Sequence, residues 1–506
     1  MTYSPKLSSA FNDTKMRSRH IAPQSGMCSF CTEECGALCE IALAAVLGSQ
    51  TVYPTNTGSN QIASEKTYPL DFSHFNINGR VFGAQGVPEE YEQASIYNVK
   101  LGKSYGRHHR VKLAWPLILP ALIKLNWQDY FAGAAMAGVS AVIGENARDK
   151  DPGLKIEEGK IVEFKALEPM LNAFRRYERG YGQIILQCNV EDDLLGLPEY
   201  ALKEHGLEAL EFKFGQGAKG TQPARKLRSR QEALEKIEAG FLVFPRPEDP
   251  EMIQKEQEGT CPNFYLYERL PLWDEEYLIK RIRRLRELGL KNVYFKMAGY
   301  DLRDLKRVLF LGSQAEVDLI TFDGAGGGSG YSPNKMMNEW GLPTVVLEEA
   351  VCALSRELRL KKQYVPALAI TGGFSTEDQV FKALAYGQGA ITAVGLGRAA
   401  MAAAMAGRRI GRLIEEGRIP QALSRHGRTA AELFADLPDL RALYGREANS
   451  FPLGAVGVFS YLNKIAFGLK HFAALNRKFD LSYLNQNDLI PLTGEARDLI
   501  RGRWFL

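Results

Sequence analysis

Short apolar segments alternate with amphipathic helical patterns along the chain from about residue 115 onward. Eight of the apolar segments carry few charges and are rich in β-branched, aromatic and Leu residues, which is typical of strands buried on both faces. The stretches between them place apolar residues three and four positions apart, the period of an amphipathic helix. We expect strands at 116–122, 140–145, 183–188, 209–215, 292–297, 319–324, 367–372 and 390–397. We expect helices at 128–136, 167–176, 274–288, 301–311, 345–360, 377–386 and 399–415.

Eight strands that alternate with helices predict parallel βα units, and eight is the number that closes a (β/α)8 TIM barrel. An open doubly wound sheet is the alternative, but no G-x-G-x-x-G motif follows the first strand. We therefore expect an α/β protein with a TIM barrel over residues 113–415, interrupted by a charged, Pro-rich insertion at 220–270. Residues 1–112 are expected to form an N-terminal extension, and residues 416–506 a helical C-terminal region.

Charge and hydropathy narrow the class of partner. The 506 residues include 63 Lys and Arg against 59 Asp and Glu, and the net charge of +4 is too small to indicate nucleic acid or an anionic membrane as the main partner. No apolar run approaches the roughly 18 residues of a membrane span, and the first 27 residues lack the apolar core of a signal peptide. We expect a cytoplasmic protein that acts on a small molecule and keeps its thiols reduced.

Four of the seven cysteines lie within twelve residues, at Cys28, Cys31, Cys35 and Cys39. Because a disulfide framework is not expected in a reducing compartment, this cluster indicates a metal or a redox group. Four thiolates suit a [4Fe–4S] cluster and a structural Zn²⁺ ion equally well as ligands. Zinc modules usually separate two close pairs of ligands, so the single short run favours the iron–sulfur cluster. Zinc and unmetallated thiols are the alternatives.

Polar residues stand at the carboxyl ends of the expected strands, where the active site of a TIM barrel is built. They are Glu145, Gln187, Lys213, Gln216, Lys296 and Asp323. Lys213 and Lys296 close apolar strands, and a lysine that faces the barrel axis is costly to bury unless it meets an anionic ligand. An ion pair with Glu145 or Asp323 is the alternative. Glu145, a carboxylate beside a glycine, is the best candidate for proton transfer.

Two late strands end in glycine loops, Gly372-Gly373 and Gly395-Leu396-Gly397, and Arg398 follows the second loop. Glycine lets the backbone approach a phosphate closely, and the loops after strands seven and eight are the usual phosphate site of a barrel. Tight turns without a ligand are the alternative. The densest glycine stretch, which contains Gly326 and Gly327, is expected to be either a flexible lid or a backbone cradle for a ring or a phosphate.

A run of basic residues precedes the barrel. His108 and His109 stand between Arg107 and Arg110. We expect this run to form a basic surface turn that leads into the barrel, with a catalytic role as the alternative.

Three motifs in order resemble the FMN-binding domain of the glutamate synthases, most closely the short synthase-like proteins that stand alone. They are EFKFGQGAK at 211–219, FDGAGGGSGYSP at 322–333, and TGG at 371–373 followed by VGLG at 394–397. The resemblance implies an FMN whose phosphate lies at the two late glycine loops and Arg398, and whose ring lies over the strand ends. It also implies flavin or substrate contacts for Gln187, Lys213, Gln216, Lys296, Asp323, Gly326 and Gly327, with Lys296 stabilising the reduced ring.

The chain also departs from the family pattern. The cysteine triplet that holds a three-iron cluster in the family is replaced by the sequence RAAMAAAMA from Arg398 onward. No cysteine starts the sequence, so glutamine hydrolysis by the usual N-terminal nucleophile is not expected. Gly144-Glu145-Asn146 and the segment after Lys219 keep only part of the family's loops, which weakens the inference that 2-oxoglutarate is the substrate.

The resemblance implies an FMN-dependent oxidoreductase that passes electrons through a cluster and FMN to an imine or another unsaturated substrate. Glu145, Lys213 and Lys296 would be its catalytic residues, and a ferredoxin-like or NAD(P)H-oxidising protein would supply the electrons. Synthesis of glutamate from 2-oxoglutarate and ammonia is one version of this activity. A flavoenzyme with a different substrate and a non-catalytic subunit of a redox complex are the alternatives, and both a homo-oligomer and a complex subunit stay open.

Overall fold

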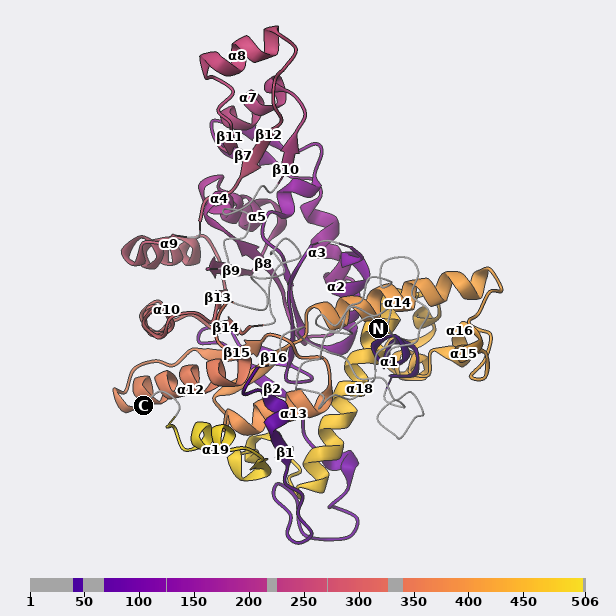
Figure 1. Cartoon of the computed structure of the whole chain (residues 1–506). Coiled ribbons are helices and arrows are strands. Elements are labelled where there is room, and N and C mark those ends of the chain that lie inside the picture. Colours follow the sequence, from indigo (N-terminus) through magenta and orange to yellow (C-terminus); the bar gives the residue numbers. More distant parts are fainter. Residues whose placement is uncertain are drawn as a thin grey trace, which may run out of the picture.

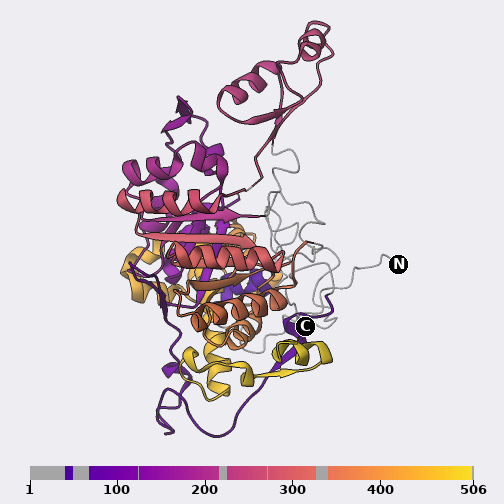
Figure 2. The same cartoon turned by 90° about the vertical axis from the view of Figure 1, so that its left-hand side faces the viewer.

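The computed structural model of the chain describes residues 40–48, 68–123, 125–215, 225–270, 272–325 and 340–503. Eight parallel strands form a closed barrel, as the sequence predicts, and the last strand pairs with the first. In order around the barrel they are β4 (Leu117–Leu122), β5 (Ser140–Ile143), β8 (Ile184–Cys188), β9 (Ala209–Phe214), β13 (Asn292–Ala298), β14 (Leu319–Asp323), β15 (Ala367–Thr371) and β16 (Ile391–Gly395). Each expected strand overlaps one of these eight strands, which Figure 2 shows from the side.

Helices cover the outside of the barrel and follow the strands in sequence. They are α2 (Trp127–Ala137), α3 (Leu167–Arg175), α4 (Val190–Leu194), α5 (Leu197–His205), α9 (Glu275–Glu287), α10 (Leu302–Gln314), α12 (Thr344–Leu360), α13 (Glu377–Tyr386) and α14 (Arg398–Glu415). Side-chain caps start α4, α9, α10 and α13, and at α13 Thr376 forms a capping box with Gln379. The connections contain a hairpin of β6 (Lys155–Glu157) and β7 (Lys160–Glu163), and short 3-10 helices at Phe72–His74, Ile96–Asn98, Ala147–Lys150, Gly445–Ser450, Leu481–Tyr483 and Gln486–Asp488.

The barrel interior changes from apolar to polar along the strands. Near the strand starts it is filled by the buried side chains of Ile118, Val142, Ile185, Ala209, Tyr294, Leu319, Ala369 and Ala393. Residues two positions later face the same way, because side chains alternate along a strand. On five strands these later residues are Gln187, Glu211, Lys296, Thr321 and Thr371, and all of them are buried. The polar part of the interior therefore lies toward the carboxyl ends of the strands.

A hairpin from the N-terminal extension closes the floor of the barrel. It consists of β2 (Lys103–Tyr105) and β3 (Val111–Leu113). The hydroxyl oxygen of Tyr105 lies 3.3 Å from that of Tyr294 and 3.2 Å from Oγ of Ser140. The turn between the two strands carries the exposed basic run that the sequence places at the surface. The expected boundary between residues 112 and 113 falls within β3. Tyr105, Val111 and Leu113 of the hairpin share the apolar core at the strand starts, so this part of the extension packs against the barrel.

The insertion after β9 folds as a small sheet with two helices. Its elements are β10 (Arg225–Leu227), α7 (Arg230–Glu238), β11 (Leu242–Phe244), α8 (Pro250–Gln257) and β12 (Phe264–Tyr267). The strands are antiparallel with β12 in the middle, and side chains from both helices and the sheet form a separate small core. The unit projects away from the barrel in both views (Figures 1 and 2).

The C-terminal region is helical, as predicted. Its helices are α15 (Gln421–Ser424), α16 (Ala430–Leu433), α17 (Leu437–Tyr444), α18 (Leu453–Leu475) and α19 (Gly494–Ile500). The long helix α18 packs against α2, α14 and the N-terminal helix α1 (Glu40–Leu47), while β1 (Phe75–Ile77) pairs with β17 (Leu489–Pro491) near α19 (Figure 1). Within the described ranges, no helix combines the length and the hydropathy that a membrane crossing needs.

Candidate active site

Lys213 and Glu145 form an ion pair at the rim of the barrel. Lys213 is the penultimate residue of β9, and Glu145 lies two residues beyond the end of β5. The Nζ of Lys213 lies 3.1 Å from Oε1 of Glu145, and the lysine is only 5% exposed. The sequence left open whether Lys213 meets a ligand or a carboxylate, and in this structure it meets a carboxylate. The pair places a cation beside a group that can hold a proton.

Lys296 and Asp323 form a second pair on the neighbouring strands. Lys296 lies in β13, Asp323 ends β14, and the Nζ of Lys296 lies 3.6 Å from Oδ2 of Asp323. Both residues are buried, so solvent screens their attraction little. The negative charge of Asp323 also interacts with Arg398, the first residue of α14. Burial lowers the pKa of Arg398 to about 10 and the negative charge of Asp323 opposes this shift, so the guanidinium stays charged at neutral pH.

A buried carboxyl group, Glu211, interacts through its charge with the lysines of both pairs and was not singled out from the sequence. It lies two residues before Lys213 on the same face of β9, and its Oε1 accepts a hydrogen bond of 2.5 Å from Nε2 of Gln187. Burial raises the pKa of Glu211, while the positive charge of Lys296 and the hydrogen bond from Gln187 oppose the shift. The alternation of side chains along β9 is the signal that could have identified this residue.

The two late glycine loops are shaped by close packing between strand ends. Gly372 has a φ of 120°, and a Cβ there would lie 2.8 Å from the backbone N of Gly324. A Cβ on Gly395 would lie 2.7 Å from the Cβ of Thr371. Close packing is therefore enough to explain these two glycines, and this is what the alternative of tight turns without a ligand proposes. Gly397 directly precedes α14, an 18-residue helix whose first N–H groups have no acceptor within the helix, so the position also suits a phosphate.

A hydrogen-bonded network joins the insertion to the rim, and the sequence did not reveal it. Nδ2 of Asn146 donates to Oε1 of Glu268 at 2.6 Å, and Nδ2 of Asn189 donates to Oδ1 of Asn146 at 3.0 Å. Asn146 and Asn189 follow β5 and β8, and Glu268 directly follows β12, the last strand of the insertion. The partners lie 79 residues or more from Glu268 along the chain, so no local spacing marks them.

Some expected site residues lie outside the described residues. They are Gln216, Gly326, Gly327, Cys28, Cys31, Cys35 and Cys39. In the part of the chain that the structure describes, no group of three or more His, Cys, Asp or Glu side chains is placed to hold a metal ion. The [4Fe–4S] cluster and the zinc alternative therefore stay predictions.

Residues 268–409 match the family model described as the conserved region in glutamate synthase. This range begins where the insertion ends and runs through β13, β14, β15 and β16 into α14. It contains Lys296, Asp323, Arg398 and both late glycine loops. No curated protein matches the chain.

Several solved structures resemble the chain at low identity. A double mutant of flavocytochrome b2 with pyruvate bound is 12% identical, with a TM-score of 0.45 over 85% of this chain and 78% of the other. A refolded lactate oxidase of Pediococcus acidilactici is 12% identical, with a TM-score of 0.41 over 83% and 84%. The monotopic membrane protein (S)-mandelate dehydrogenase is 13% identical, with a TM-score of 0.42 over 83% and 88%. These low values say nothing about chemistry. The family match confirms, over residues 268–409, the resemblance seen in the sequence.

Proposed function

We propose that the chain is an FMN-dependent oxidoreductase whose active site is the polar rim at the carboxyl ends of the barrel strands. The observation that carries the proposal is the family match, which covers the strand ends with Lys296 and Asp323, both glycine loops and Arg398. The site geometry supports it, because these residues converge on one end of a closed barrel. A polar, charged strand end is where barrel enzymes hold their substrates.

The residues at the start of α14 fit the phosphate of FMN. Gly397 and Arg398 begin the helix, and the guanidinium of Arg398 is able to make bidentate hydrogen bonds to a phosphate. Gly373, with a φ of 86°, gives the preceding loop a backbone conformation that side chains rarely adopt. Lys296 and Lys213, on neighbouring strands and in register, would face the ring. When bound, FMN supplies hydride and single-electron transfer.

The two lysine–carboxylate pairs give the site its proton chemistry. Reduction of a C=N or C=C bond needs a proton at the atom that does not receive hydride. Glu145 is the group proposed to deliver it, because it stands at the rim and its side chain is less buried than that of its partner Lys213. The cation of Lys213 favours the ionised carboxylate, so Glu145 would take up its proton when a substrate carboxylate takes its place beside Lys213. Lys213 is also proposed to bind a substrate carboxylate, since that anion would replace the charge of Glu145 when Glu145 is protonated.

We propose an imine or another unsaturated compound as the substrate, with glutamate synthesis from 2-oxoglutarate and ammonia as the first version to test. The test reduces the FMN-loaded full chain without oxygen and adds 2-oxoglutarate and ammonia. Rapid reoxidation of the flavin, with glutamate formed, supports the synthase. No reoxidation with either compound indicates a flavoenzyme of different substrate. The variant Glu145→Gln should keep its FMN and slow the reaction by about 10²-fold or more, the usual contribution of proton transfer.

Electron supply is the remaining part of the proposal. Cys28, Cys31, Cys35 and Cys39 would bind a [4Fe–4S] cluster that accepts electrons from a ferredoxin-like or NAD(P)H-oxidising protein. Iron and acid-labile sulfide analysis of anaerobically purified protein tests this, with about four iron atoms expected for each chain. A zinc-loaded, iron-free preparation would contradict the cluster. The FMN proposal does not depend on this outcome.

A further inference from the structure

A cavity of about 740 Å³ lies at the end of the barrel opposite to the candidate active site. Its walls come from the turn between β2 and β3, the segment from the end of α3 to the start of β8, the loop before β9 and the start of β13. The barrel strands that border the cavity contribute their amino-terminal ends to its wall. The volume is in the range of sites that hold a nucleotide-sized molecule.

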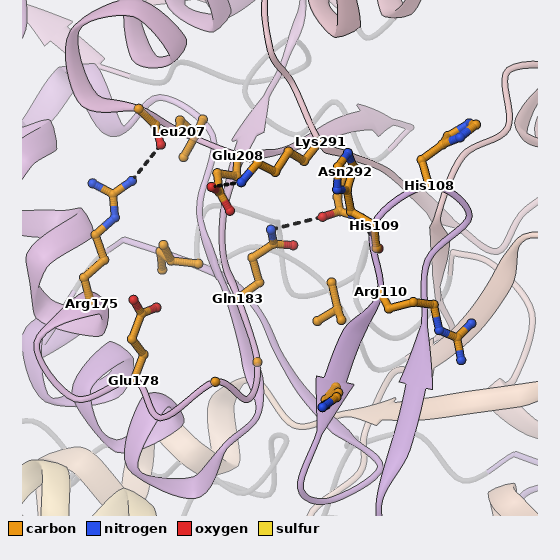
Figure 3. Close-up of a pocket in the computed structure, with 16 residues that line it drawn as sticks. His108, His109, Arg110, Arg175, Glu178, Gln183, Leu207, Glu208, Lys291 and Asn292 are labelled. Carbon is orange, nitrogen blue, oxygen red and sulfur yellow. Dashed lines mark hydrogen bonds and ion pairs between the residues drawn. The ribbon is translucent and has the colours of Figure 1, made fainter.

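Cationic side chains outnumber carboxylates in the lining of this cavity. Figure 3 shows Arg175 and Glu178 on one side and the basic hairpin turn on the other. Glu208 is paired with Lys291, so these two charges compensate each other. The remaining cations of the lining are Arg110, Lys112 and Arg175, and the remaining carboxylate is Glu178. Arg175 lies on the same side as Glu178, whereas the side chain of Arg110 is directed outward at the opposite edge of the cavity (Figure 3). His108 and His109 also line the cavity, and Nε2 of His108 lies 2.8 Å from Oε2 of Glu316.

The remaining cations form no ion pair among the described residues, although the charge of Arg175 acts on the carboxyl group of Glu178. Arg110 donates from Nη2 to the neutral hydroxyl of Ser104 at 2.5 Å. Arg175 donates to the carbonyl oxygens of His205 and Gly206, which orient the guanidinium without neutralising it. Lys112 has no ion pair among the described residues. An excess of positive charge in a concave polar site attracts a small anion.

The cavity wall is rigidly connected to the barrel floor. Nδ2 of Asn292 donates to the carbonyl oxygen of His109 at 2.9 Å, and its Oδ1 accepts from Nε2 of Gln183 at 3.1 Å. Oε1 of Gln183 accepts from the hydroxyl of Tyr294 at 2.6 Å, and that hydroxyl lies 3.3 Å from the hydroxyl of Tyr105. A ligand held by the hairpin turn would therefore also stabilise the hairpin against the barrel.

We propose that this cavity binds a small organic anion with at least two negative charges, a phosphate ester or a polycarboxylate. The positive groups of Lys112 and Arg175 recognise the anion and Arg110 adds positive charge at the edge, while the volume of about 740 Å³ accommodates a molecule up to nucleotide size. The site is separate from the strand ends and does not rest on the proposed oxidoreductase activity.

Isothermal titration of the full chain with AMP, pyrophosphate and citrate tests the proposal. We expect saturable binding of at least one of them with one site for each chain. Binding of AMP or pyrophosphate but not of citrate would indicate a phosphate ligand. Binding of citrate alone would indicate a polycarboxylate. Binding must persist in the variant Arg398→Ala, because that arginine belongs to the proposed FMN phosphate site at the other end of the barrel. Hydrogen exchange of residues 103–113 should slow on addition of the ligand.

Charge variants locate the site. The exposed residues Arg110 and Lys112 can be replaced without opening the core, and Arg110→Ala/Lys112→Ala should weaken binding at least tenfold. Glu178→Gln removes the opposing charge and should tighten binding severalfold. Arg418→Ala removes an exposed cation elsewhere and should change the affinity by less than twofold. Absence of binding by all three probes, or equal affinity of the double variant and the parent, would overturn the proposal.

Discussion

The Nζ of Lys213 lies 3.1 Å from Oε1 of Glu145, although the strands that carry the two residues are not neighbours. β8 separates β5 from β9 in the barrel, so the pair reaches across one strand at the rim. Gln187 fills the space on that strand and accepts a weak hydrogen bond of 3.4 Å from the backbone N of Glu145. The three strand ends are thus held together by polar contacts that face the barrel mouth.

Replacing Lys213 with Met should lower the free energy of unfolding by about 1–3 kcal/mol, because a nearly buried carboxylate loses its cation. Urea unfolding measures this loss. Lys155→Met is the matched control: Lys155 also pairs with a glutamate, but its side chain is 64% exposed, and less than about 0.5 kcal/mol should be lost. The double variant Lys213→Met/Glu145→Gln should recover part of the loss. Equal effects of the two lysine variants would contradict the pairing.

Arg398→Ala should weaken FMN binding about 10- to 100-fold, the range expected when a charged hydrogen-bonding group to a phosphate is lost. Fluorescence titration of the apoprotein with FMN measures the affinity. Arg412→Ala removes an exposed arginine from the last turn of the same helix, so it controls for helix charge. It should leave the affinity within twofold. An unchanged affinity in Arg398→Ala would remove this residue from the proposed phosphate site.

Gly372→Ala should destabilise the fold by about 2–4 kcal/mol, because the new Cβ meets the backbone of Gly324 and φ is unfavourable for alanine. Gly389→Ala is the matched control. Gly389 also has a positive φ of 78°, but nothing lies within 4 Å of its Cβ position, so only the backbone strain of about 1 kcal/mol applies. Thermal unfolding compares the two variants. A loss no larger for Gly372→Ala than for Gly389→Ala would show that the close contact is absent.

Glu348 predicts a pH dependence of stability. It is fully buried in α12, and neither carboxylate oxygen has a hydrogen-bond partner among the described residues. Burial raises the pKa of Glu348 well above its usual value, so the folded protein keeps the group protonated while the unfolded chain ionises it near pH 4.3. Between these two pKa values the unfolded state binds fewer protons than the folded state. The contribution of Glu348 to the free energy of unfolding therefore falls as pH rises, by about 1.4 kcal/mol for each pH unit until the folded pKa is reached.

Glu348→Met should remove this loss, so its stability relative to the parent should increase from pH 5 to pH 8. Urea unfolding at several pH values measures the difference. Glu357→Gln, on the same helix, is the control. Ion pairs with Lys361 and Lys306 lower the pKa of Glu357, so its contribution is lost as pH falls and has the opposite sign. A pH-independent difference between Glu348→Met and the parent would contradict the buried protonated state.

The barrel could be predicted because its strands are buried on both faces and therefore lack polar residues until they reach the rim. The same contrast located Lys213, Lys296 and Asp323 at strand ends. Their pairing could not be predicted, because it depends on which strands become neighbours and on how far each side chain reaches. Glu211 escaped notice because a single charge in an apolar strand has no local motif. The contacts of Glu268 join parts of the chain that are brought together only by the fold.

The central claim, that this barrel holds FMN, is tested most directly by the absorbance spectrum of anaerobically purified full-length protein combined with an FMN titration. The account predicts flavin bands, or in protein that has lost the cofactor, saturable quenching of FMN fluorescence with one site for each chain. Broad absorbance beyond the flavin bands would indicate that the iron–sulfur cluster is also present. A colourless protein that leaves FMN fluorescence unchanged at micromolar concentrations would contradict the account and favour a non-catalytic role.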